Sequence, residues 1–263
     1  MAKHDDWTWL TNEVHAAIDA YVAQLDGLTG SEKVPNLDWS VAELTAHLAS
    51  LPSVYAHQHA LAEDFARADD MAQWSIDQRS HIATDDLDAV RALLRSEVEE
   101  FISGIGEPDE HRWLYGSRTT HRNLLGAILV ELVVHGQDLG KLTGGGTKLT
   151  SDQAKAGLAN VMAIAPSFVD HAKAAKLPGT YQLSFRGGGG EWFYRIDDKG
   201  QLTVTEGKAD RADARLSADA AAFMLVSLGR MNPFLPAFKG QTLAYGRKPW
   251  KLLALGDIVV DGV

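Results

Sequence analysis

Residues 120–142, THRNLLGAILVELVVHGQDLGKL, predict a long helix that faces a hydrophobic core. Apolar residues recur every three or four positions, and a run of glycines at 144–146 ends the pattern. The positions that define the apolar face are Leu124, Leu125, Ile128, Leu132 and Leu139. Such a helix is stable mainly when its apolar face packs against other elements.

Three more helices are predicted upstream of this segment. Residues 5–28 carry apolar residues at helical spacing before glycines interrupt the pattern. Ser40 and Glu43 form a capping box at the start of a second helix, which we expect to reach about residue 79. Residues 84–102 form a third, and a loop with Gly106, Pro108 and Gly116 is expected to follow it. Four long helices with short or moderate connections indicate a four-helix bundle.

The pattern changes in the second half of the chain. Residues 151–175 predict one more helix, and beyond Pro178 apolar and polar residues alternate, which is the period of a strand. Three short strands separated by turns predict an antiparallel sheet over residues 181–185, 192–196 and 202–204. A further helix is expected over residues 218–228. We therefore predict a two-domain α+β protein, with a helical bundle over residues 1–146 and a small α+β domain over residues 147–263.

The composition excludes several classes of function. The formal net charge is -10 and there is no run of lysine and arginine, so nucleic acid is not an expected partner. The chain has no cysteine, which excludes disulfides, zinc–thiolate sites and a cysteine nucleophile. Any thiol chemistry must use an external thiol. Neither a secretory signal nor a membrane-spanning stretch is present, so we expect a cytoplasmic protein without a membrane partner.

Two residues of the quoted helix have the spacing of metal ligands. Glu131 and His135 are four residues apart, so they lie on one helix face about one turn apart and can bind the same ion. Asp138 follows three residues later and is a candidate for an outer partner that orients an imidazole. Because a catalytic metal usually has three protein ligands and one open position, a third ligand is expected from another helix.

His47 is the best candidate for that third ligand. It lies in the second predicted helix among apolar residues, where a polar ring needs a partner. A glutamate and a histidine four apart are also common as a surface pair, and a lone histidine in an apolar run is often a hydrogen-bonded core residue. The residues alone leave both explanations open. The other histidines lack such a pattern, and we expect polar, solvated roles for His57, His59, His81, His111 and His121.

Two segments resemble a known family. Residues 39–48, WSVAELTAHL, resemble the segment around the first metal ligand in DinB-like bundles, and in particular in the mycothiol-dependent maleylpyruvate isomerase family. Residues 131–139, ELVVHGQDL, resemble the second motif of that family. The resemblance implies that His47, Glu131 and His135 bind a divalent metal, typically zinc. It also implies a second domain similar to sterol carrier protein type 2 from about residue 150.

The resemblance further implies an enzyme that uses the low-molecular-weight thiol mycothiol as a cosubstrate. The reaction would be an isomerisation like that of maleylpyruvate or an S-transfer, on a small electrophile or organic acid. Alternatives are a hydrolase that uses metal-bound water and a lipid or small-molecule binding protein with a structural metal. No catalytic residue beyond the metal ligands is indicated, nor is the oligomeric state. Arginines of the second half are candidates for substrate contacts: Arg186, Arg195, Arg230 and Arg247.

Overall fold

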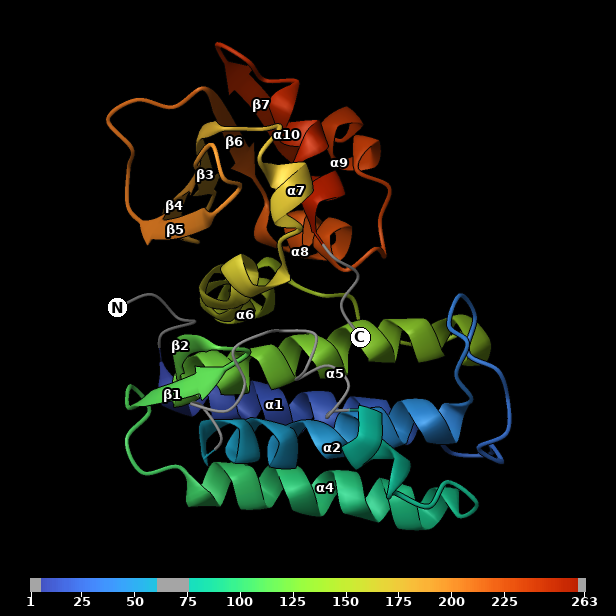
Figure 1. The fold of residues 1–263 in the computed structure, drawn as a ribbon. Coiled ribbons are helices and arrows are strands. Elements are labelled where there is room, and N and C mark those ends of the chain that lie inside the picture. The colour runs from blue at the N-terminus through green and yellow to red at the C-terminus, as the bar shows by residue number, and fades with distance from the viewer. Residues whose placement is uncertain (1–5, 61–75, 260–263) are drawn as a thin grey trace. The chain divides into compact units, whose positions relative to one another are not determined.

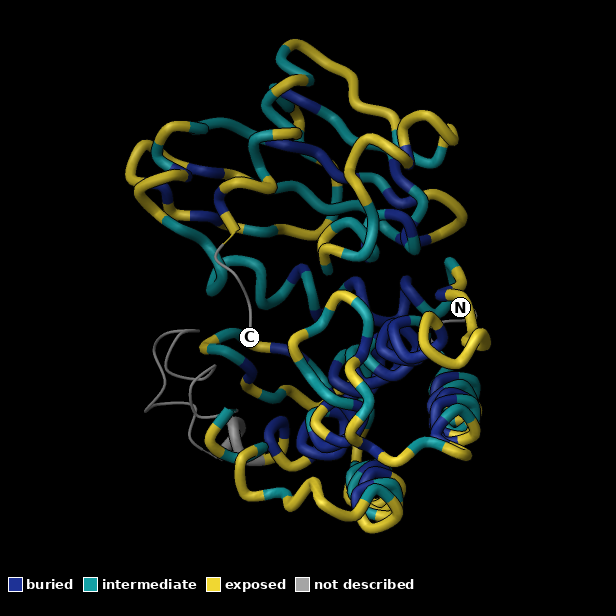
Figure 2. The backbone as a smooth tube through the Cα atoms, turned by 90° about the vertical axis from the view of Figure 1, so that its right-hand side faces the viewer, coloured by how far each residue is buried: buried dark blue, intermediate teal, exposed yellow. Residues whose placement is uncertain are grey.

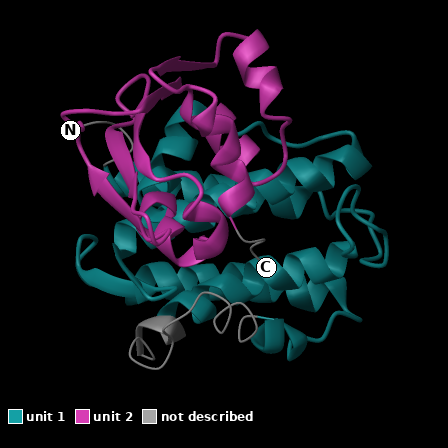
Figure 3. Ribbon diagram, turned by 45° about the horizontal axis from the view of Figure 1, so that its top comes forward, with its two compact units in different colours: residues 1–160, 263 teal, residues 161–262 magenta. Residues whose placement is uncertain are grey.

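The computed structural model describes residues 6–60 and 76–259, and of residues 57–60 it describes the backbone alone. The chain divides into two units, residues 1–160 with 263 and residues 161–262 (Figures 1 and 3). The first unit is largely helical and the second contains the large sheet, which confirms the predicted α+β class. Among the described residues, no helix combines the length and the apolar character that crossing a lipid bilayer requires.

The first unit contains the long helices that the sequence predicts. They are α1 (Trp7–Ala23), α2 (Val41–Ala60), α4 (Leu87–Gly104) and α5 (His121–Thr143). Helix α1 packs along α5, and α2 packs against both α4 and α5 (Figure 1). The second helix was expected to reach about residue 79. It is described to Ala60, residues 61–75 lie outside the described part, and residues 76–80 are again helical.

The helix ends and the core follow local rules of sequence. The backbone N–H of Ser40 donates to Glu43 at 2.6 Å and that of Glu43 donates to Ser40 at 3.2 Å, which confirms the capping box. Thr120 caps α5 through the N–H of Asn123. The apolar faces are fully buried, with Leu44, Leu94 and Leu125 at 0% exposure. Figure 2 shows buried backbone concentrated in the helices and exposed backbone in the loops.

A β-hairpin lies where the sequence predicts only a loop. Strands β1 (His111–Leu114) and β2 (Ser117–Thr120) pair in antiparallel fashion ahead of α5. Their two-residue turn has positive φ at both positions, 49° at Tyr115 and 71° at Gly116. Such a turn is usually signalled by Asn-Gly or Asp-Gly. A tyrosine at the first position hides the signal, so the prediction of a loop was wrong here.

Helix α6 (Ser151–Ile164) packs on the bundle through a close backbone approach. A Cβ atom on Gly126 of α5 would lie 2.1 Å from the carbonyl oxygen of Ala156, so only glycine allows this contact. The hydroxyl of Thr119 also donates to Asn160 at 3.1 Å. The two units therefore divide within α6, whereas the sequence places the domain boundary ahead of this helix, between residues 146 and 147.

The second unit contains a five-stranded sheet in the order β5-β4-β3-β6-β7. Its strands are β3 (Gly179–Phe185), β4 (Glu191–Ile196), β5 (Leu202–Glu206), β6 (Ala214–Ala218) and β7 (Thr242–Gly246). The predicted antiparallel arrangement of the first three strands is confirmed. The sheet is mixed because β6 pairs with β3 in parallel. Strands β6 and β7 were not predicted, since β6 pairs in parallel with β3 and β7 pairs with β6, and both pairings join segments that are far apart in the sequence.

Short helices complete the second unit. They are the 3₁₀ turn η2 (Ala165–Phe168), α7 (His171–Ala174), α8 (Ala220–Ser227), α9 (Phe234–Phe238), α10 (Lys251–Ala254) and η3 (Gly256–Ile258). The single helix predicted over residues 151–175 is thus interrupted, because Pro166 has no N–H to continue it. Tyr181 is fully buried in the core of this unit, with Ala214 and Ile258 beside it.

Candidate metal centre

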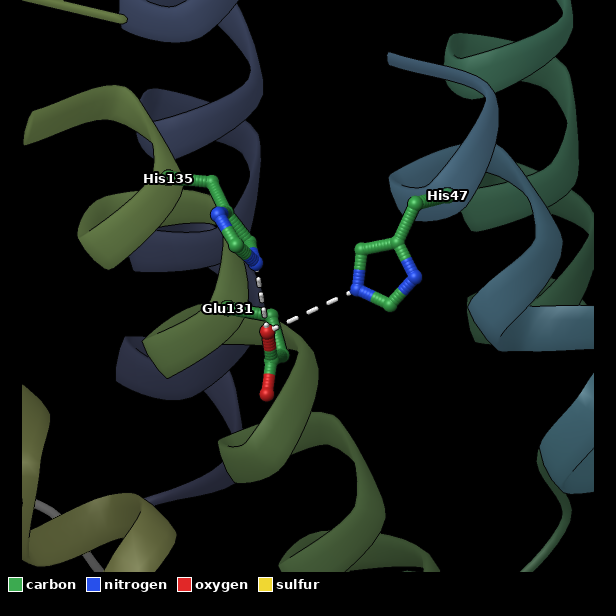
Figure 4. Close-up of side chains that lie close together, drawn as sticks. All are labelled: His47, Glu131 and His135. Atoms are coloured by element: carbon green, nitrogen blue, oxygen red, sulfur yellow. Dashed lines mark ion pairs between the residues drawn. The ribbon is translucent and has the colours of Figure 1, made fainter. Parts of the chain in front are cut away.

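Three polar side chains from two helices converge inside the bundle (Figure 4). Glu131 and His135 project from successive turns of α5, and His47 projects toward them from α2. The Oε2 atom of Glu131 lies 3.2 Å from Nε2 of His135 and 3.8 Å from Nε2 of His47. One potential ligand atom from each residue lies within 4.8 Å of the others. Within the described residues this is the one such cluster.

The cluster fits a divalent metal such as zinc. Two imidazoles and one carboxylate form a common zinc ligand set, and ligand atoms bound to one ion at about 2 Å lie about 3–3.5 Å apart. The observed separations therefore require only small side-chain movements. The two imidazole rings are nearly perpendicular, at 84°, with their centroids 5.3 Å apart. The side chains keep limited access to solvent, from 6% for His135 to 28% for Glu131.

The electrostatics of the site favour the protonation states that a metal needs. Burial lowers the pKa of His47, although the Glu131 carboxylate opposes the change. Burial alone would raise the pKa of Glu131, but interactions with the two imidazoles outweigh it, and the pKa falls well below its usual range. An ionised carboxylate and a neutral imidazole at position 47 are both competent metal ligands.

Asp138 lies behind His135, where an outer partner of a metal ligand is expected. Its Oδ2 atom is 3.4 Å from Nδ1 of His135, on the side of the ring away from Glu131. The carboxylate is almost completely buried and accepts a hydrogen bond of 2.8 Å from Nζ of Lys141. A buried carboxylate in this place orients the imidazole and strengthens it as a ligand.

Trp39 and Arg79 also lie beside the cluster, and neither was predicted from the sequence as a site residue. The ring centroid of Trp39 lies 5.0 Å from that of His47 and 6.3 Å from that of His135. The guanidinium carbon of Arg79 lies 4.5 Å from the centroid of Trp39, which is a cation–π contact. Trp39 immediately precedes the capping box, so it could have been linked to the site through that motif. Arg79 lies beyond residues 61–75 and has no local signal.

Arg79 brings a positive charge to the site. Burial lowers its pKa, while Glu43 raises it, and arginine stays protonated under all ordinary conditions. Its charge also contributes to the lowered pKa of His47, so the two groups interact. Arg79 forms no ion pair with a carboxylate among the described residues. A half-buried arginine in this position can bind an anionic group that enters from outside.

Tyr55 of α2 is a further polar residue close to Glu131. It is 5% exposed, and its pKa is raised well above the usual value by burial and then by the charges of Tyr115 and Glu131. The phenol therefore keeps its proton and can serve as a hydrogen-bond donor near the carboxylate.

The other histidines whose side chains the structure describes do not join the cluster. His81 and His111 are exposed, as predicted, while the side chains of His57 and His59 lie outside the described part. His121 was expected to be solvated, but it is 6% exposed because Arg112 and the carbonyl oxygen of Glu107 contact its ring. That ring supports the start of α5.

Two of the four candidate arginines have backbone contacts within the second unit. Arg186 donates to the carbonyl oxygen of Gly240 at 3.0 Å, and Arg230 donates to that of Leu228 at 2.7 Å. These contacts give the two arginines structural roles. Substrate contacts of Arg186, Arg195, Arg230 and Arg247 stay a prediction.

Two family models match the chain. The mycothiol maleylpyruvate isomerase N-terminal domain matches residues 11–140, which contain the three converging side chains. The SCP-2 sterol transfer family matches residues 164–245, which contain the large sheet. No curated protein sequence matches the chain.

Solved structures share the fold at low sequence identity. A histidine-to-alanine mutant of the mycothiol-dependent maleylpyruvate isomerase has a TM-score of 0.52 and 15% identity, over 88% of this chain and 93% of that chain. The corresponding structure without the mutation has a TM-score of 0.49 and 14% identity over the same shares. The sterol carrier protein domain 2 of Helicoverpa armigera has a TM-score of 0.33 and 19% identity, over 43% of this chain and 93% of that chain. At these identities the likeness concerns the fold alone.

Proposed function

We propose that the chain is a metal-dependent enzyme that uses mycothiol as its thiol cosubstrate. The proposal rests on the family to which the chain belongs, which joins a mycothiol maleylpyruvate isomerase N-terminal domain to an SCP-2 sterol transfer domain. The observation that carries the proposal is the convergence of His47, Glu131 and His135 within 4.8 Å. The reaction is either an isomerisation like that of maleylpyruvate or a thiol S-transfer.

The three converging residues would hold the metal, which we expect to be zinc. When bound, zinc lowers the pKa of a thiol that coordinates it and so supplies a thiolate at neutral pH. The chain has no cysteine of its own, so the thiol has to come from a cosubstrate. Asp138 keeps the His135 ring oriented, and the tightly packed apolar faces of α2 and α5 hold the ligands in place.

The charges around the cluster favour an anionic substrate. Two neutral imidazoles and one carboxylate leave a bound divalent ion with a net positive charge, and Arg79 adds another positive charge through its contact with Trp39. We therefore expect a small electrophile that carries a carboxylate, such as an unsaturated organic acid. Arg79 would hold that carboxylate, and the flat face of Trp39 would limit where the rest of the substrate lies.

The test combines metal analysis with a thiol assay. Wild-type protein should bind about one equivalent of zinc per chain and consume mycothiol, or isomerise a cis-unsaturated acid in its presence. His47→Ala should lose both properties. His15→Ala is the matched control, because His15 also lies beside a glutamate, Glu99 at 3.1 Å, but outside the cluster.

Two outcomes would contradict the proposal. If wild-type protein binds zinc but neither consumes thiol nor isomerises any acid of a broad panel, the thiol-dependent reaction is wrong. If it hydrolyses amides or esters without thiol, it is instead a hydrolase that uses metal-bound water.

A second candidate function is the binding of a lipophilic small molecule by the second unit. The match of residues 164–245 to the SCP-2 sterol transfer family favours it. Mass spectrometry of an organic extract of the purified protein should then reveal a bound lipid in amounts close to one per chain. An extract without lipid, together with no uptake of a fluorescent fatty acid, would count against this candidate.

A further inference from the structure

Strand β7 forms one edge of the sheet of the second unit, and one of its sides has no partner strand. It is last in the sheet order and pairs only with β6 among the described strands (Figure 1). Helix α9 precedes β7 and packs against it, yet four of the five residues of β7 are exposed. Leu243 is 59% exposed and Tyr245 is 43% exposed. The strand therefore offers both backbone groups and apolar side chains to another chain.

This edge lacks the features that keep edge strands from pairing with other chains. Such features are charged side chains on the strand, proline, or a β-bulge that bends the strand away. Residues 241–246, QTLAYG, contain neither a charge nor a proline. The register with β6 runs without interruption from Thr242 to Gly246, so the strand has no bulge. An exposed edge of this kind favours pairing with another strand.

The opposite edge of the same sheet is protected. Strand β5 ends in the charged residue Glu206 and packs against η2. Its exposed side chains Thr203 and Thr205 are polar, whereas Leu202 and Val204 pack in the core of the unit. Of the two edges, β7 alone combines a free side with exposed apolar side chains.

The pairing with β6 fixes which backbone groups of β7 are available. The N–H of Asp219 donates to the carbonyl oxygen of Gln241 at 2.7 Å, just before β7 begins. In an antiparallel pair, residues that bond to the neighbouring strand alternate with residues that do not. Leu243 and Tyr245 therefore direct their backbone groups to β6. Ala244, at the middle of the strand, directs its N–H and C=O to the free side, as do the two end residues.

A second copy of the same strand fits this free side. In an antiparallel pair centred on Ala244, the two Ala244 residues exchange backbone hydrogen bonds across a two-fold axis. Each Leu243 then lies opposite Tyr245 of the partner subunit, in the closely spaced type of pair in which side chains contact each other. Arg247 lies opposite Gln241 of the partner subunit, so this cation does not face its own counterpart.

We propose that two copies of the protein associate through β7, so that their sheets join into one continuous sheet. The mutual pairing of Leu243 and Tyr245 favours a second copy over a foreign strand, which would have to supply matching apolar residues. Each copy contributes one short strand, so the interface is small and we expect a dissociation constant on the order of 10 μM. The pairing uses no residue of the metal cluster, so it and the proposed function can fail independently.

The test is sedimentation velocity of the full-length protein over a concentration series. We expect monomer at about 1 μM and mostly dimer above about 100 μM. Ala244→Lys places two like charges opposite each other at the centre of the pair, so it should weaken association about tenfold or more. The matched control is Thr203→Lys, which puts the same charge on the exposed side of β5 and should leave association unchanged.

A charge swap separates pairing from folding. Ala244→Asp should weaken self-association in the same way as Ala244→Lys. An equimolar mixture of the two variants should associate again, because opposite charges then face each other across the axis. Recovery in the mixture also shows that both variants are folded.

A single cysteine tests the register. The chain has no cysteine, so Ala244→Cys introduces the only thiol. The Cα atoms of a hydrogen-bonded antiparallel pair lie about 5.5 Å apart, within the range that a disulfide spans. Mild oxidation should therefore give a covalent dimer of Ala244→Cys and none of Thr203→Cys at the same concentration.

The proposal is overturned if wild-type protein stays monomeric throughout the series, or if Ala244→Lys forms dimers as well as wild type does. It is also overturned if the two cysteine variants cross-link equally, because random collision would then explain the disulfide.

Discussion

The helical unit buries charged side chains, whereas the sheet unit exposes apolar ones. In the first unit Glu131 and Asp138 lie inside the bundle, next to His135. In the second unit Phe238 and Trp250 are largely exposed. Each arrangement costs folding free energy, because a buried charge loses its hydration and an exposed ring orders water. Under the proposed function, a bound cation would offset the buried negative charge of the first unit.

The largest expected effect is the stabilisation of the helical unit by zinc. If the buried charges exist to bind a cation, free zinc at a thousand times its dissociation constant should raise the free energy of unfolding by about 4 kcal/mol. His135→Ala should abolish the increase, and His15→Ala should keep it. Urea denaturation with and without zinc measures the effect. An equal increase in His135→Ala would place the ion elsewhere.

The next effect concerns the packing that holds α5 in place. Gly126→Ala should lower the free energy of unfolding by about 3 kcal/mol, because its Cβ would meet the backbone of α6 at 2.1 Å. Gly136→Ala on the same helix is the matched control. Its Cβ would lie 3.5 Å from Gln24, an ordinary contact, so the better helix propensity of alanine should stabilise the protein by up to about 1 kcal/mol. Equal effects would refute the close approach.

Removing the charge behind His135 should have an intermediate effect. Asp138→Asn keeps the shape of the side chain but loses its charge, so we expect zinc affinity to fall by about 10- to 100-fold. Competition with a coloured chelator measures the affinity. Lys141→Gln, which removes only the partly exposed partner of Asp138, should change the affinity less. Unchanged affinity in Asp138→Asn would show that this carboxylate has only a structural role.

A smaller effect is expected from the cation beside Trp39. Arg79→Gln should raise KM for a carboxylate substrate about tenfold with little change in kcat, because one charge-assisted hydrogen bond is lost. Arg79→Lys should restore part of the affinity. The corresponding ester, which lacks the charge, serves as the control substrate. If KM for acid and ester rise equally, Arg79 does not contact the carboxylate.

The smallest effect is expected from an exposed apolar side chain of the second unit, compared with a buried one of the first unit. Phe238→Ser should change the free energy of unfolding by less than about 0.5 kcal/mol, since an exposed ring contributes little to folding. Leu44→Ala, at a fully buried position of α2, should lower it by about 2–5 kcal/mol. A large loss in Phe238→Ser would mean that this ring packs inside the protein.

Local patterns in the sequence predicted the helices and two of the three residues of the candidate metal cluster, with His47 as the expected third ligand. Glu131 and His135 share a face because their spacing matches the helical repeat, and Ser40 with Glu43 marks the start of α2. The hairpin ahead of α5 escaped prediction because Tyr115 adopts a positive φ that tyrosine rarely takes. Strands β6 and β7 escaped it because their pairing depends on distant parts of the chain.

The sequence by itself determined which residues can form helices and which of their faces are apolar, since both follow from the chemistry of neighbouring residues. Only the tertiary structure decided that His47 meets Glu131, that Arg79 lies over Trp39, and which rings of the second unit are exposed. These contacts join segments far apart in the chain. Their formation depends on how helices and strands pack, and no local pattern of residues encodes that packing.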